Sequence, residues 1–213
     1  MVPEYTRAER LADRCIHALG IPLGVAGAVV LIALAAPGGT NAALLSVVLY
    51  SVGLVAMLTG SAAYNITEQP QRKALLRRLD HAGIFVMIAG TYTPFTLVSV
   101  GGATGTVYCA AMWLAAAGGV LLKLRFPRRF ERLSLVLYLV MGWSILAMAP
   151  SLAAKVSTGV LVMLILGGVL YTAGVGFHVA RRLRFHNAVW HAFVLGGASV
   201  HYVAVLQGVA LSD

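Results

Sequence analysis

The segment "FHNAVWH", residues 185–191, places two histidines, His186 and His191, five positions apart at the start of an apolar run. Histidines four positions apart share a helix face and often a metal ion, whereas five positions rotate the second side chain by about 140°. The residue that shares a face with His191 is Asn187, because four positions rotate it by only about 40°. His186 can join His191 at a metal only if it precedes the first helical turn.

The composition of the chain is that of a membrane protein. Hydrophobic residues make up 60% of the sequence and charged residues only 11%, against about half and about a quarter in soluble domains. The formal net charge of +9 comes from short basic clusters between apolar runs. Such clusters are typical of membrane topology signals, and we expect no nucleic-acid partner.

Seven apolar runs are each near the length, about 20 residues, that a helix needs to cross a bilayer. They predict an all-α integral membrane protein, a seven-transmembrane helix bundle in which residues 1–213 form a single domain. The first run exceeds the apolar core of a cleavable signal peptide, about 7–15 residues, so we expect it to be retained. The predicted spans are 16–36, 43–65, 80–99, 104–124, 132–150, 157–179 and 187–209.

Basic residues are unevenly distributed among the connections between these spans. Loops 68–78, 123–132 and 180–185 are basic, whereas of the 16 lysines and arginines only Lys155 lies in one of the other three loops. Because positive charge stays on the cytoplasmic side, the pattern predicts a cytoplasmic N-terminus and an outside C-terminus.

Two further expectations follow from this topology. Cys15 and Cys109 would lie on opposite sides of the bilayer, which argues against a disulfide between them. Residues 68–79 carry three leucines among their charges and are predicted to form a short helix lying on the membrane surface.

Polar residues converge on the cytoplasmic end of the predicted bundle. Ser61 and Asn65 end the second span, Asp80 begins the third, and Asn187 and His191 begin the seventh. Polar groups at membrane depth are costly, so side chains gathered from three helices in one layer are candidates for a functional site.

Each of these residues also has a purely structural explanation. Asp80 could cap a helix or pair with a nearby arginine, and His191 could bond a backbone carbonyl. Asn65 and Asn187 could link helices, while Ser61 could bond a carbonyl of its own helix.

The remaining histidines have separate expected roles. His81 and His186 are expected to be solvated at the head-group level, and His178 is expected at the membrane interface. His17 either joins the polar layer or caps the bundle. His201 lies ten positions, about 15 Å, beyond His191 and is expected to make its own buried hydrogen bond.

Several strings in the chain together resemble one membrane protein family. The sequence is similar to the haemolysin III branch of the progestin and adipoQ receptor family over nearly its whole length. The resemblance implies seven helices and an inner-leaflet zinc ion held by one histidine of helix 2 and two of helix 7. It also implies a serine and an aspartate beside the metal-bound water. The matching strings are "ERLADRCIH" (9–17), "SAAYN" (61–65), "RRLDHAGIFVMIAGTYTPF" (77–95), "YTAGVGF" (171–177) and "WHAFVLGGASVHY" (190–202).

The residues at the implied site match the family only in part. Ser61, Asp80 and His191 match, but Asn65 and Asn187 stand at two of the three zinc-ligand positions. His186 is one position too early to replace Asn187. Amide oxygens are poor zinc ligands, so we expect strongly reduced zinc affinity at His191, Asn65, Asn187 and His186. The asparagines would instead keep a hydrogen-bonded network without metal.

Three functions therefore stay open from the sequence. The first is a membrane-embedded hydrolase that cleaves a ceramide-like lipid amide or ester. With zinc bound, Asp80 would be the general base and Ser61 would assist. Without zinc, Asp80 and His191 would act as a general acid–base pair. The second is a non-catalytic lipid-binding or sensing protein, and the third is a membrane-permeabilising cytolysin. Membrane lipids are the expected partners, and a bacterial inner membrane is the expected location. The sequence does not decide between an enzyme and a non-enzyme, nor does it give an oligomeric state.

Overall fold

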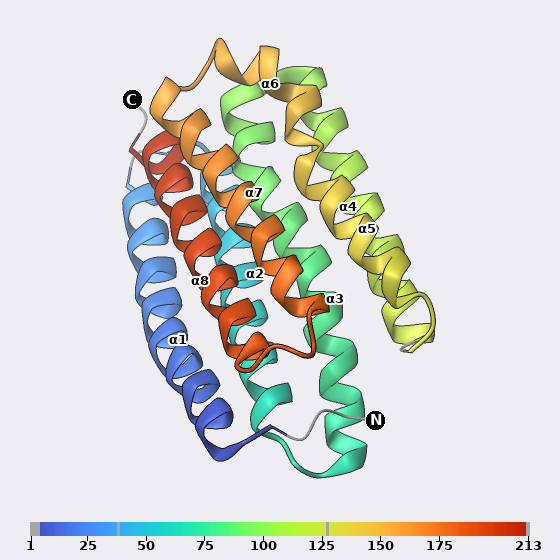
Figure 1. Ribbon diagram of the computed structural model, residues 1–213. Helices are drawn as coiled ribbons and strands as arrows, with labels where there is room; N and C mark the ends of the chain where they lie inside the picture. Colours follow the sequence, from blue (N-terminus) through green and yellow to red (C-terminus); the bar gives the residue numbers. More distant parts are fainter. Residues whose placement is uncertain (1–4, 38, 127, 212–213) are drawn as a thin grey trace.

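The computed structural model describes residues 5–37, 39–126 and 128–211, and these residues form a bundle of helices (Figure 1). Within this part of the chain, seven helical stretches are long and apolar enough to cross a membrane. They correspond to the predicted spans, so the all-α, seven-helix prediction is confirmed. The elements are α1 (Arg7–Ala35), α2 (Asn41–Ile66), α3 (Pro70–Pro94), η1 (Phe95–Val100), α4 (Gly102–Arg125), α5 (Glu131–Trp143), α6 (Ile145–Ala153), α7 (Thr158–Val179), α8 (His186–Val205) and η2 (Leu206–Ala210).

The first helix begins at Arg7, well before the predicted start at residue 16. Thr6 and Glu9 form a capping box, in which the Thr6 hydroxyl accepts from the Glu9 backbone N–H and the Glu9 carboxylate accepts from the Thr6 N–H. This arrangement satisfies backbone donors that a helix start leaves free, so the helix extends through the charged N-terminal segment. The extension puts Asp13 and His17 on one helix, one turn apart.

The third helix also begins earlier than predicted, at Pro70. Proline suits the first helical position because its fixed φ is already helical. The prediction of a separate surface helix at residues 68–79 is therefore wrong, because most of this segment is the first part of α3. Asp80 lies inside the helix, so the interpretation of Asp80 as a helix cap is also wrong.

The fifth predicted span consists of two helices, α5 and α6, which meet at Ser144. The Ser144 hydroxyl donates to the carbonyl of Met141 at 2.7 Å and to the Tyr92 hydroxyl oxygen at 3.0 Å. A serine that bonds back to its own helix commonly bends it, which accounts for the break.

The bundle places α1, α2, α3, α7 and α8 together, with α4 and α5 at one side (Figure 1). The last spanning helix, α8, packs on α7 and on α1, so the first and last spanning helices lie side by side. Tyr50 and Phe95 are fully buried in the centre, whereas many leucines and valines are exposed, as expected for a surface that faces lipid. Both cysteines are free, as predicted, and His201 Nε2 lies 3.0 Å from the carbonyl oxygen of Leu164, which confirms the separate hydrogen bond.

Two neighbouring glycines of α4 give a test of this packing. A Cβ at Gly119 would lie 2.5 Å from ring carbons of the fully buried Phe85 of α3, whereas a Cβ at Gly118 would meet no atom within 4 Å. We expect Gly119→Ala to lower the melting temperature, because overpacking costs about 1–3 kcal/mol. Gly118→Ala should leave it unchanged or raise it, since alanine favours helix. Thermal unfolding of purified protein in detergent checks this, and equal effects of the two changes would contradict the packing of α3 on α4.

Candidate functional site

A cavity of about 930 Å³ opens at the end of the bundle where α1, α3 and α8 begin and α2 ends. Side chains from α1, α2, α3, α4, α5, α7 and α8 line it. All five residues that the topology assigned to one layer are among them: Ser61, Asn65, Asp80, Asn187 and His191. The structure therefore brings together the polar residues of the second, third and seventh spans.

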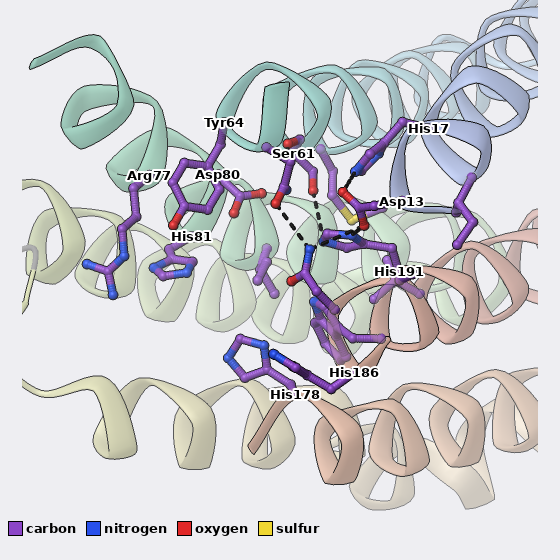
Figure 2. Close-up of a pocket in the computed structure, with 18 of the residues that line it drawn as sticks. Asp13, His17, Ser61, Tyr64, Arg77, Asp80, His81, His178, His186 and His191 are labelled. Carbon is purple, nitrogen blue, oxygen red and sulfur yellow. Dashed lines mark hydrogen bonds and ion pairs between the residues drawn. The ribbon is translucent and has the colours of Figure 1, made fainter. Parts of the chain in front are cut away.

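His191 is buried in the second turn of α8, and both of its ring nitrogens have partners (Figure 2). Nδ1 lies 2.5 Å from Asp13 Oδ1, and Nε2 lies 3.3 Å from Ser61 Oγ. A carboxylate can only accept a hydrogen bond, so Nδ1 carries the proton that it donates to Asp13. In neutral imidazole Nε2 is then unprotonated and accepts the hydrogen bond from the Ser61 hydroxyl.

Asp13 is the residue of this site that the sequence analysis missed. Its Oδ1 also accepts from Asn187 Nδ2 at 3.2 Å, and its Oδ2 lies 3.5 Å from His17 Nε2. The predicted start of the first span at residue 16 left Asp13 among the head-group charges. The signal that could have found it is its four-residue spacing from His17, which puts both side chains on one helix face.

The two asparagines are bonded to one another and to their neighbours. Asn187 Nδ2 donates to Asn65 Oδ1 at 3.2 Å, and Asn65 Nδ2 donates to the carbonyl of Ser61 at 2.9 Å. Their amides thus belong to the hydrogen-bonded network around His191. The zinc-ligand positions implied by the family resemblance do not fit zinc, because two of them offer amides that bond to each other.

Ser61 lies between Asp80 and His191 (Figure 2). The side chain of Asp80, on α3, is close enough to interact with the Ser61 hydroxyl. A chain of polar side chains therefore runs across four helices: Asp80 of α3, Ser61 of α2, His191 of α8, and Asp13 and His17 of α1.

His186 takes no part in this chain of side chains. It is buried, with its Nε2 3.4 Å from the hydroxyl of Tyr5, so the expectation of a solvated histidine is wrong. The preceding Phe185 has a φ of 59°, and its N–H donates to Glu9 Oε1 at 2.9 Å. This contact holds the start of α8 against α1, where the first side chain of α8 faces Tyr5 rather than His191.

The cavity lining also contains a group of ionic side chains that sequence patterns did not reveal. Glu131 Oε1 lies 3.0 Å from Arg77 Nη2, and Glu131 Oε2 lies 3.5 Å from the ammonium of Lys123. The Lys123 side chain is only 2% exposed. These ion pairs join α3, α4 and α5 where the three helices line the cavity.

Two kinds of chemistry fit these positions. A hydroxyl bonded to an imidazole that a carboxylate orients is the arrangement of nucleophile, general base and orienting group found in serine hydrolases. Among the described residues, Asp13, His17 and His191 also offer one ligand atom each within 4.8 Å of one another, a group that could hold a metal ion.

Known proteins of similar sequence place the chain in a family. The family model described as "Haemolysin-III related" matches residues 8–202. The Hemolysin-3 homolog of Bacillus subtilis (strain 168) is 35% identical over 202 residues, covering 95% of each chain. Hemolysin-3 of Bacillus cereus is 34% identical over 198 residues, covering 93% of this chain and 90% of the relative.

A human relative extends the similarity beyond bacteria. The monocyte to macrophage differentiation factor of Homo sapiens is 30% identical over 165 residues, covering 74% of this chain and 67% of the relative. With the match over residues 8–202 and seven helices able to span a membrane, this supports the wider receptor-family relationship. The chain is an integral membrane protein that belongs to the haemolysin III-related family, the haemolysin III branch of the progestin and adipoQ receptor family.

Proposed function

We propose that the protein is a membrane-embedded hydrolase that cleaves the acyl bond of a lipid amide or ester. Ser61 is the nucleophile, His191 is the general base, and Asp13 orients the imidazole. The observation that carries the proposal is the chain of contacts from Ser61 Oγ through both nitrogens of His191 to Asp13 Oδ1, at 3.3 and 2.5 Å. Such a triad is recognised by geometry rather than by the order of its members in the sequence.

The reaction follows from the tautomer of His191. As Ser61 Oγ attacks the acyl carbon, the hydroxyl proton moves to Nε2, and the Asp13 carboxylate stabilises the resulting imidazolium. The proton passes to the leaving amine or alcohol when its bond to the acyl carbon breaks. Water then attacks the acyl group on Ser61, and His191 takes a proton from this water. The bond between the acyl carbon and Ser61 Oγ breaks, Oγ receives the proton from His191, and the fatty acid leaves.

This mechanism assigns Asp80 a different role from the one expected from the sequence. The expectation was a general base, but the base next to the Ser61 hydroxyl is His191 Nε2. Asp80 lies on the other side of Ser61, and we assign it the positioning of the hydroxyl. No step passes through zinc, because the family's ligand positions carry hydrogen-bonded asparagines.

The cavity supports a lipid as the substrate. Its volume of about 930 Å³ is at the upper end of ordinary small-molecule sites, about 300–1,000 Å³. Apolar side chains such as Leu58, Leu195 and Val194 line it together with the polar chain of residues. This combination suits a molecule with an apolar tail and a polar linkage.

Non-catalytic lipid binding is the second candidate function. The observation that favours it is the closed network of Asn65, Asn187 and Asp13, in which each amide nitrogen has a partner. Such a network also serves to hold helices together around a bound lipid. Lipid retained at one molecule per chain without turnover would establish this function instead.

We further propose that the N-terminus and the cavity face the cytoplasm, in a bacterial inner membrane. The basic first turns of α3 and the basic last turn of α4 lie at the same end of the bundle as the start of α1 (Figure 1), and positively charged segments between spans remain inside.

Cysteine labelling tests this orientation. In a Cys15→Ser/Cys109→Ser background, we expect a membrane-impermeant maleimide to label Lys155→Cys in intact spheroplasts. Arg128→Cys should be labelled only after permeabilisation, because it lies in a basic loop. The reverse pattern would mean that the N-terminus is outside.

Turnover measurements test the catalytic proposal. Purified protein in lipid nanodiscs should release fatty acid from at least one member of a panel of ceramides and glycerolipid esters, as measured by mass spectrometry. Ser61→Ala should reduce this rate by about 10³-fold or more, because the nucleophile is lost.

The matched control is Ser51→Ala, which removes a buried hydroxyl of the same helix that has no hydrogen-bond partner. It should leave the rate unchanged. Turnover that survives in Ser61→Ala, or no turnover on the whole panel, would overturn the proposal.

A further inference from the structure

The side chains of Asp13 and His17 project from successive turns of α1 toward His191 of α8 (Figure 2). All three are buried, and one nitrogen or oxygen from each lies within 4.8 Å of the others. Two imidazoles and one carboxylate form a donor set that zinc uses in proteins, with a water molecule as the fourth ligand. Only His191 is shared with the zinc positions that the family resemblance implies.

His17 has no role in the proposed hydrolysis, and its contacts point to a ligand. The side chain is 8% exposed, and its Nε2 has no hydrogen-bond partner although it lies 3.5 Å from Asp13 Oδ2. Two atoms bound to one tetrahedral zinc ion at about 2.0–2.1 Å are separated by about 3.3 Å. The separation of His17 and Asp13 is therefore close to that of two ligands of one ion.

The contact between His191 and Asp13 has a different length. At 2.5 Å, Nδ1 and Oδ1 are too close to be two ligands of a tetrahedral ion, and they are at the distance of a strong hydrogen bond. Zinc can use Nδ1 only if it takes the place of the shared proton and the two atoms separate by roughly 0.8 Å.

We propose that Asp13, His17 Nε2 and His191 Nδ1 form an inhibitory site for a divalent transition metal of the zinc class. Ligation of Nδ1 moves the proton of the neutral imidazole to Nε2, which then donates to Ser61 Oγ instead of accepting from it. His191 can no longer act as a base, and Asp13 no longer orients it. The metal site is inferred from the positions of the three side chains alone, whereas the inhibition rests on the proposed hydrolase function.

Metal binding tests the site without reference to activity. After treatment with a chelator, the wild-type protein should bind one Zn²⁺ per chain by elemental analysis, and Co²⁺ should give the absorption bands of a tetrahedral site. Mg²⁺ should not compete, because it prefers oxygen ligands.

The matched variants are His17→Gln and His186→Gln, two histidines that line the same cavity. Removal of the ligand in His17→Gln should weaken Zn²⁺ binding more than about tenfold. His186→Gln should bind as the wild type does. The elution profile in size-exclusion chromatography confirms that each variant is folded.

Fatty-acid release then tests the inhibition. Zn²⁺ should stop release by the wild-type protein, while His17→Gln should remain active at the same Zn²⁺ concentration. Absence of Zn²⁺ binding, or equal binding by His17→Gln, would overturn the site, and faster release with Zn²⁺ would overturn the inhibition. Zn²⁺ binding that depends on His17 in a protein that hydrolyses no lipid would support the site and remove the hydrolase proposal.

Discussion

The contact between Asp13 and His191 is the interaction on which the site depends. It joins an early turn of α1 to an early turn of α8, the first and last spanning helices, inside a membrane protein. A buried carboxylate is tolerated only when it is paired or hydrogen-bonded, and Asp13 Oδ1 contacts His191 Nδ1 and accepts from Asn187 Nδ2. Removal of one partner from such a buried pair commonly costs about 3–5 kcal/mol. The same contact places the proton of the neutral His191 ring on Nδ1, so the Ser61 hydroxyl faces an unprotonated Nε2.

The contacts of Asp13 explain why Asn65 and Asn187 suit this site. They stand where the family resemblance implies zinc-binding histidines. The Asn187 amide donates to Asp13 and to the side-chain oxygen of Asn65. The Asp13 carboxylate from α1 contacts Nδ1 of His191 in this site.

Most of the fold could be predicted from the sequence, because hydropathy locates the spanning helices and the charge of the loops indicates their direction. The seven spans and the convergence of Ser61, Asn65 and Asp80 needed only the lengths of apolar runs and the alternation of direction. The starts of the helices were harder to predict from the sequence. A capping box at Thr6 extends α1 through charged residues, which a hydropathy pattern does not assign to a spanning helix. The prediction therefore missed the nine helical residues 7–15, and with them Asp13 and its contact with His191.

Other errors have a similar local cause. The surface helix expected at residues 68–79 was inferred from its mixed leucines and charges, but the pattern does not distinguish a separate helix from the beginning of a spanning one. His186 was expected to be solvated because it lies just before the seventh predicted span. Its actual surroundings depend on the contact between Phe185 and Glu9, residues far apart in the sequence.

The protonation of the two ring nitrogens of His191 tests the account most directly. ¹⁵N NMR of histidine-labelled, chelator-treated protein in nanodiscs reports which nitrogen carries the proton, and comparison with His191→Gln assigns the signals. The account predicts a neutral ring protonated at Nδ1, with Nε2 free to accept from Ser61. A ring protonated at Nε2 in the metal-free protein would contradict it, because Asp13 would then not orient His191 and Ser61 would have no base.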